Sequence, residues 1–136
     1  MAQTIRTETV AIRSDEDVSK VRQLTRLLAV ELGFSIVEQT KIVTAASELA
    51  RNIIVHGGGE GTAVLETLSN ITVKGLRIKF EDSGPGISDL NQALQDGYTS
   101  AGGLGLGLGG ARRLVNDFSI TSEVGKGTRV IITRWK

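Results

Sequence analysis

The chain contains 136 residues, enough for one hydrophobic core and too few for two, so we expect a single domain over residues 1–136. A formal net charge of +1 and only three Phe, one Tyr and one Trp argue against nucleic acid as a partner, because nucleic-acid binding calls for a basic surplus or a platform of aromatic rings. Cysteine is absent, which excludes disulfides and thiolate zinc sites, and no apolar run has the length of a signal-peptide core or a bilayer span, so we expect a cytoplasmic protein without a membrane partner.

The first part of the chain predicts one strand followed by two helices. Residues 4–12 alternate loosely between polar and apolar, which indicates a strand. Ser14 precedes three acidic residues, which favours a helix capped by Ser14, and apolar residues recur at helical spacing until Gly33 ends the helix. A second helix begins at the capping-box sequence of residues 35–38 and continues to the three glycines at 57–59.

The rest of the chain predicts four strands and one more helix. Two strands, 62–68 and 71–81, flank a short turn, and residues 82–103 are polar, glycine-bearing and irregular. A third helix over 106–116 precedes two strands, 118–123 and 128–135. Because most strands arrive in hairpins, we predict an α+β two-layer sandwich rather than a doubly wound parallel sheet.

A polar stripe on the second predicted helix is the first candidate for chemistry. Glu48, Asn52 and His56 are spaced four residues apart, and at roughly 100° per residue the first two border the buried face centred on Leu49. Both can be boundary residues that merely solvate the helix flank. Alternatively, the carboxamide oxygen of Asn52 ligates a hard cation and Glu48 acts as a base. We interpret His56 as a hydrogen-bonded core residue rather than a catalyst.

The end of the strand before residue 82 is the second candidate. Asp82 follows an apolar strand, and Gly84 and Gly86 flank Pro85, so the backbone there can turn sharply or approach a ligand closely. An Asp at the first position of an ordinary turn gives the same pattern. Alternatively, the Asp82 carboxylate accepts a hydrogen bond from an exocyclic amine such as that of adenine.

The third candidate is the glycine run at residues 102–110, at the beginning of the third predicted helix. Exposed N–H groups and the helix dipole together favour an anion such as phosphate, although a hinge without a ligand is the alternative. No strand precedes the run and only 26 residues follow it, which argues against a Rossmann domain, and residues 125–128 lack the spacing of a Walker loop. Arg112 and Arg113 follow the run, and we interpret them as solvated surface residues.

Four motifs in this order resemble the GHKL superfamily of ATPases and kinases. They are Glu48-x-x-x-Asn52 with His56 (the N box), residues 82–87 (the G1 box), the Gly-Leu-Gly-Leu-Gly run (the G2 box) and residues 125–128 (the last glycine box). The resemblance covers almost the whole chain. It implies the Bergerat ATP-binding fold, in which a mixed, mostly antiparallel sheet is covered on one face by three helices. Because the chain is short, it resembles most the anti-sigma-factor and switch-protein serine kinases of the stressosome type.

The resemblance implies a role for each matching residue. Glu48 is the general base for the acceptor serine, Asn52 holds Mg²⁺, and Asp82 binds the amino group of adenine. The glycines and threonine that shape the adenine pocket or wrap the phosphates of ATP are Gly84, Gly86 and Thr128, and Gly103, Gly105, Gly107 and Gly109. Gly110 departs from the expected pattern, because a proline is common near that position in relatives, which implies a looser lid over the nucleotide.

The implied activity is a serine/threonine-protein kinase that uses Mg-ATP. Its implied substrate is a serine of a STAS-domain antagonist protein, and a PP2C-type phosphatase is a second implied partner. Two alternatives stay open: an anti-sigma factor that sequesters a sigma factor, and a nucleotide-regulated binding module in which Glu48 is not catalytic. A sensor histidine kinase is not expected, because the chain has no room upstream for a dimerisation helix pair and its only histidine is in the N box.

Overall fold

A computed structural model describes residues 2–94 and 107–136 of the chain. Its elements are β1 (Gln3–Ile12), α1 (Asp15–Glu31), α2 (Ile36–Val55), β2 (Gly61–Ser69), β3 (Lys74–Asp82), α3 (Leu90–Ala93), α4 (Gly107–Arg113), β4 (Asp117–Glu123) and β5 (Gly127–Trp135). The predicted glycine segment at 95–106 lies outside the described residues.

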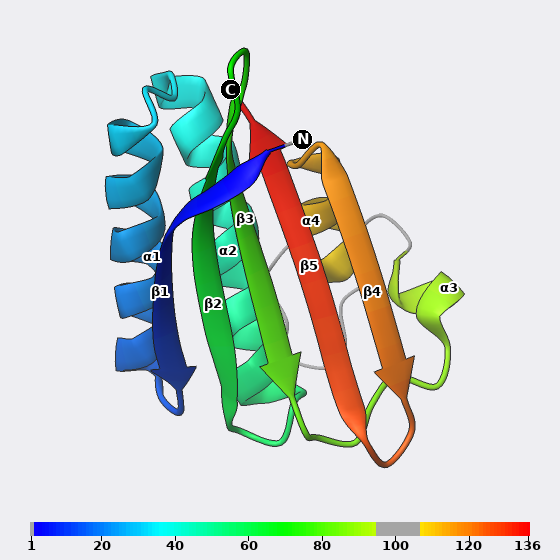
Figure 1. Cartoon of the computed structure of the whole chain (residues 1–136). Coiled ribbons are helices and arrows are strands. Elements are labelled where there is room, and N and C mark those ends of the chain that lie inside the picture. Colours follow the sequence, from blue (N-terminus) through cyan, green and yellow to red (C-terminus); the bar gives the residue numbers. More distant parts are fainter. Residues whose placement is uncertain (1, 95–106) are drawn as a thin grey trace.

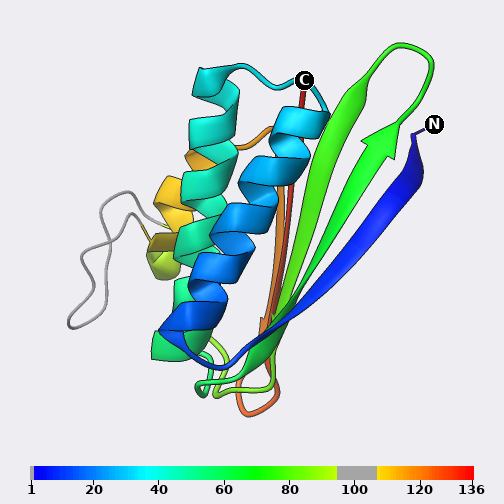
Figure 2. The ribbon, with the colours of Figure 1, turned by 90° about the vertical axis from the view of Figure 1, so that its left-hand side faces the viewer.

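The strands form one sheet in the order β1-β2-β3-β5-β4, and α1, α2 and α4 cover one of its faces (Figures 1 and 2). This confirms the predicted α+β sandwich. The sheet is not mixed, however, because every pairing in it is antiparallel. The short helix α3 lies in a segment predicted to be irregular. No helix in the described ranges is long and apolar enough to cross a membrane.

The sequence predicted the cap of α2 correctly, but not the side-chain contact that caps α1. The capping box at Ser35 and Glu38 is present, with each side chain accepting a hydrogen bond from the other residue's backbone N–H. Ser14 is the N-cap residue of α1, but its side chain accepts no cap hydrogen bond. Asp17 supplies the polar contact instead, because its Oδ2 accepts from the backbone N–H of Arg13 at 2.9 Å.

The turn between β2 and β3 is longer than predicted. The side chain of Asn70 accepts hydrogen bonds from the backbone N–H groups of Thr72 and Val73, which builds a turn that mimics a backbone turn. Strand β3 therefore begins at Lys74 rather than at Ile71, whose side chain is fully exposed.

The core lies between the sheet and the helices. Ile42 and Leu49 of α2 are fully or almost fully buried against sheet residues such as Ile78 and Phe80. Because side chains alternate along a strand, Asp82, two residues beyond Phe80, has its side chain on this same helix-covered side. The Asp82 side chain therefore points toward the end of the layer of helices.

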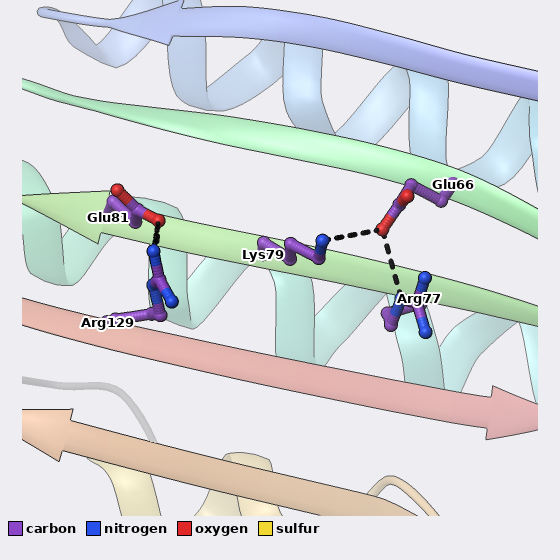
Figure 3. A network of polar contacts seen from close by, with 5 residues as sticks. All are labelled: Glu66, Arg77, Lys79, Glu81 and Arg129. Atoms are coloured by element: carbon purple, nitrogen blue, oxygen red, sulfur yellow. Dashed lines mark hydrogen bonds and ion pairs between the residues drawn. The ribbon is translucent and has the colours of Figure 1, made fainter.

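In the part of the chain that the structure describes, the opposite face of the sheet carries no helix, and it holds a network of ion pairs (Figures 2 and 3). Glu66 on β2 is only 8% exposed, and its Oε1 lies 3.0 Å from Arg77 Nε and 3.3 Å from Lys79 Nζ on β3. Burial by itself raises the pKa of Glu66, but the hydrogen bond from Arg77 and the charges of Arg77 and Lys79 outweigh burial and lower the pKa below its usual value. The buried carboxylate is thus paired rather than isolated.

We expect Glu66→Gln to lower the free energy of unfolding by about 1 kcal/mol at neutral pH, because it removes two charge pairs whose cations remain partly solvated. Since the folded-state pKa is lowered, this contribution is present above the unfolded-state pKa and is lost as pH falls through the folded-state value. Urea denaturation at pH 7 and at acidic pH measures both effects. Glu81→Gln is the control, because Glu81 and its partner Arg129 are about half exposed, and an equal loss for both variants would contradict the prediction.

Candidate nucleotide-binding site

Three polar residues form one row across the ends of β3, β5 and β4. Asp82 pairs with Thr128, and Thr128 pairs with Ser122, so the three lie side by side. The preceding row on the helix-covered face contains Phe80, Val130 and Ile120, of which the first two are buried in the core. The polar row therefore continues the apolar face of the sheet just beyond the place where the core ends.

Asp82 is half-buried and receives hydrogen bonds from the backbone. Its Oδ1 accepts from the N–H of Gly84 at 2.9 Å, and the backbone N–H of Thr128 also donates to the carboxylate. Burial raises the pKa of Asp82 above its usual value, and these two hydrogen bonds only partly oppose the rise. A carboxylate kept partly out of water in this way is well suited to accept a hydrogen bond from a ligand.

The end of α2 lies close to the Asp82 carboxylate, a contact that the sequence did not indicate. An ideal Cβ placed on Gly57 would lie 2.6 Å from Asp82 Oδ2, and one placed on Gly84 would lie 2.4 Å from the carbonyl carbon of Gly57. Neither position has room for a side chain. The sequence predicted the glycines at 57–59 only as a helix stop, and nothing in their pattern indicated which distant residue they would contact.

The loop after Asp82 lies against the turn between β4 and β5. Gly86 has a positive φ of 76°, and a Cβ there would lie 2.4 Å from the carbonyl oxygen of Glu123. The carbonyl of Pro85 accepts from the N–H of Gly125 at 2.8 Å, and the N–H of Ile87 donates to Ser122 Oγ at 2.7 Å. The structure thus brings together four of the predicted site residues: Asp82, Gly84, Gly86 and Thr128.

Glu48 and Asn52 lie on α2, both half-buried. Within residues 2–94 and 107–136, neither side chain makes a hydrogen bond or an ion pair. At a rise of about 1.5 Å per residue, Asn52 lies about 7.5 Å and Glu48 about 13.5 Å along the helix axis from Gly57. The candidate metal and base positions therefore follow one another along α2, away from Asp82.

His56 is not a core residue, contrary to our interpretation. It is the C-cap residue of α2, where the helix ends at the glycines, and its side chain is exposed. Its backbone N–H donates to the carbonyl of Asn52 at 2.8 Å. Among the residues described, no group of three or more His, Asp or Glu side chains could hold a metal ion, so a cation at Asn52 would need further oxygen ligands from a bound phosphate.

The glycine run is only partly within the described residues. Gly103 and Gly105 lie outside them, so their predicted contacts with phosphate stay predictions. Gly107 and Gly109 lie in the first turn of α4, where backbone N–H groups have no acceptor within the helix. Arg112 and Arg113 are exposed, as we expected.

A hollow of about 300 Å³ lies at the same end of the sheet, and Asp82, Ser122 and Thr128 of the polar row are among its lining residues. The hollow also reaches the open face of the sheet, where Glu81, Arg129 and Thr121 pair in one row. Figure 3 shows Glu81 and Arg129 on that face. Glu81 and Arg129 close part of it with an ion pair. Asp82 and Thr128 have their side chains on the helix-covered side, so the predicted nucleotide site lies where the hollow meets that side.

Comparison with known families identifies this arrangement. The family model described as "Histidine kinase-, DNA gyrase B-, and HSP90-like ATPase" matches residues 37–136, which contain every candidate site residue. The chain belongs to this ATPase family. The chain therefore contains a GHKL ATPase domain, and the ATP-binding roles of its N box and glycine boxes stay predictions.

Two kinds of curated relatives match this ATPase domain. The serine/threonine-protein kinase RsbT of Bacillus subtilis is 44% identical over 126 residues, covering 93% of this chain and 94% of RsbT. The anti-sigma F factor of Clostridium kluyveri is 32% identical over 100 residues, covering 71% of this chain and 70% of that protein. The chain is thus similar, over most of both lengths, to a kinase and to an anti-sigma factor.

Solved structures share the fold of this ATPase domain. The RsbU and RsbW domains of a Mycobacterium tuberculosis protein superpose with a TM-score of 0.66 at 19% identity, over 96% of this chain and 32% of that one. The catalytic domain of the histidine kinase ThkA superposes with a TM-score of 0.53 at 17% identity, over 95% of this chain and 98% of that one. At these identities the likeness concerns the fold alone.

We expect Gly57→Ala to weaken ATP binding by about tenfold, because the new Cβ would displace the Asp82 carboxylate from its place beside α2. Titration calorimetry with Mg-ATP measures the change. In an Asp82→Ala background, where the carboxylate is absent, the same substitution should change the affinity little. Val55→Ala is the control on the exposed side of the helix, and equal effects of Gly57→Ala in both backgrounds would contradict the contact.

We expect ATP affinity to fall on acidification at a pH above that of an ordinary Asp, because the pKa of Asp82 is raised and only the ionised carboxylate is purely an acceptor. Asp82→Asn should bind ATP more weakly at neutral pH and lose this pH dependence. Since a raised folded-state pKa means that the ionised Asp82 opposes folding at neutral pH, the variant should not be less stable there. Affinity and thermal unfolding measured across pH test this, and identical pH profiles for both proteins would refute the role of Asp82.

Proposed function

We propose that the chain is a serine/threonine-protein kinase that transfers the γ-phosphate of Mg-ATP to a serine of a STAS-domain protein. The observation that carries the proposal is the 44% identity to RsbT across 93% of the chain. It is supported by membership of the ATPase family and by the order of Asp82, Asn52 and Glu48, which follow one another from the end of α2 back along the helix.

The described residues fit an adenine nucleotide. Gly57 and Gly84 let the end of α2 and the loop after β3 come close to the Asp82 carboxylate, and Asp82 and Thr128 supply oxygen acceptors at this edge. Adenine offers an exocyclic amine as a donor to such acceptors. Gly103, Gly105, Gly107 and Gly109 would wrap the phosphates through their backbone N–H groups, and Gly86 and Thr128 would shape the adenine pocket.

The positions of Asn52 and Glu48 on α2 suit phosphoryl transfer. The Asn52 carboxamide oxygen would hold Mg²⁺, which when bound neutralises charge on the phosphates. Glu48, about one helical turn further from Asp82 than Asn52 is, would accept the proton of the serine hydroxyl. The serine oxygen would attack the γ-phosphorus, and the bond between the γ-phosphorus and the bridging β-phosphate oxygen would break. The products are ADP and phosphoserine. The chain's own contribution is the alignment of these groups on one rigid helix.

Partner switching is the biological setting that this activity suggests. A STAS-domain antagonist would be the substrate, and a PP2C-type phosphatase would be activated by direct binding of the kinase. The second candidate function is an anti-sigma factor, which is favoured by the 32% identity to the anti-sigma F factor. The two functions differ in what the chain binds stably.

We expect Glu48→Gln to abolish transfer of γ-labelled phosphate to a STAS-domain protein encoded near the chain's gene, with ATP affinity retained within about threefold. Removal of a general base costs about a hundredfold or more in rate while leaving ground-state binding intact. The measurement combines a phosphoserine assay with calorimetry on the same preparations. Glu16→Gln, an exposed carboxylate on α1, is the matched control and should leave transfer unchanged.

The other outcomes separate the alternatives. An unchanged transfer rate in Glu48→Gln would refute the base assignment. No phosphate on the STAS protein, together with stable nucleotide-dependent binding of a sigma factor, would replace the kinase proposal with the anti-sigma factor.

A further inference from the structure

Ser122 lies beside the candidate adenine site without belonging to any of its motifs. It is on β4, next to Thr128, which in turn is next to Asp82. Its side-chain oxygen makes three short contacts: with the N–H of Ile87 at 2.7 Å, with the carbonyl of Gly127 at 3.2 Å and with Thr128 Oγ1 at 2.8 Å. One hydroxyl thus joins β4, β5 and the loop after Asp82.

The proton count of these contacts leaves two arrangements. A serine hydroxyl has one proton to donate and two lone pairs to accept with. The Ile87 N–H occupies one lone pair. If Ser122 donates to the Gly127 carbonyl, Thr128 must donate to Ser122, and all three contacts are hydrogen bonds. If Ser122 donates to Thr128 instead, the Gly127 carbonyl loses its bond from Ser122 and only two contacts remain.

The first arrangement is favoured, because it satisfies every polar atom in contact with Ser122. In it the proton of Thr128 is used, so Thr128 Oγ1 can offer a ligand only lone pairs. The neighbouring Asp82 carboxylate is likewise an acceptor when ionised. The edge of the site then presents two acceptors and no hydroxyl donor from these two residues.

We propose that Ser122 is a positioning residue that commits the Thr128 hydroxyl to act as an acceptor, so that the site selects a purine with an amino group at C6 over one with an oxo group. This inference rests on the proposed nucleotide site. The amino group of a 6-aminopurine can donate hydrogen bonds to the Asp82 and Thr128 oxygens. The oxo oxygen of a 6-oxopurine is itself an acceptor and cannot bond to them. Discrimination between the two bases thus depends on a residue that does not touch the nucleotide.

The test compares the dissociation constants of Mg-ATP and Mg-ITP, which carries an oxo group in place of the amino group, for wild type and Ser122→Ala. In the variant the Thr128 proton is free to donate to the oxo group, so ATP should bind more weakly and ITP as well as or better than before. The preference for ATP should fall by roughly threefold to tenfold. Ser119→Ala, on the same strand but exposed, is the control.

A purely structural role for Ser122 predicts a different result. If Ser122→Ala weakens ATP and ITP equally, the residue only holds the loop at Ile87 and the proposal is wrong. The change in preference should also vanish in a Thr128→Val background, where no hydroxyl remains to be reoriented, and its persistence there would refute the mechanism. Ser122→Thr, which keeps the hydroxyl, should restore most of the preference.

Two further results keep the proposal testable. If Ser122→Ala does not fold, Ser122→Cys, whose thiol is a weak hydrogen-bonding group, should reduce the preference in the same direction, and an unchanged preference would overturn the proposal. If wild type binds neither nucleotide, the proposed nucleotide function fails and this inference falls with it. A wild-type preference that survives in Ser122→Ala refutes this inference alone.

Discussion

The candidate site depends on how closely the end of β3 approaches the end of α2. Gly57 and Gly84 meet with no room for a Cβ on either, and the Asp82 carboxylate lies beside them. The approach joins the two layers of the sandwich at the point where the apolar core ends. It also fixes the distance from Asp82 to the polar residues further along α2, because a helix is rigid over a few turns. A larger residue at either glycine would separate the strand end from the helix and misalign both halves of the site.

Half-buried polar side chains near this contact lower the stability of the folded protein, and the fold itself does not require them. Asp82 is half-buried with a raised pKa, and Glu48 and Asn52 border the core with no hydrogen-bond partner among the residues described. By contrast, the buried carboxylate of Glu66 on the open face is paired with two cations and its pKa is lowered. Structural carboxylates are satisfied within the protein, whereas those of a binding site leave bonding capacity for a ligand. The contrast between Glu66 and Asp82 supports the assignment of the helix-covered side.

Periodicity and caps predicted the elements, and contacts between distant segments escaped prediction. The Ser35 capping box was correct because its signal is contained within four residues. At Ser14 the neighbouring Asp17 took over the polar contact, and both residues suit a helix beginning, so the local pattern could not separate them. Asp82 was predicted from its motif and stays a prediction, whereas the contacts of Gly57 and Ser122 are with residues 25 and 35 positions away, Asp82 and Ile87. One-dimensional patterns carry no information on such pairs.

Fold alone does not decide which reaction this ATPase domain performs. The catalytic domain of ThkA, a histidine kinase, has the same fold although it is only 17% identical to this chain. The anti-sigma F factor of Clostridium kluyveri is 32% identical to this chain. In this chain the sheet and the helix layer bring a strand end and a helix end together. The acceptor of the phosphate is then chosen by what lies at the other end of the nucleotide, where a base must meet the incoming hydroxyl. In this chain Glu48, one turn beyond Asn52 along α2, is the group that we propose for that position. On this proposal, the difference between a nucleotide-binding module and a serine kinase depends on one half-buried carboxylate rather than on the architecture.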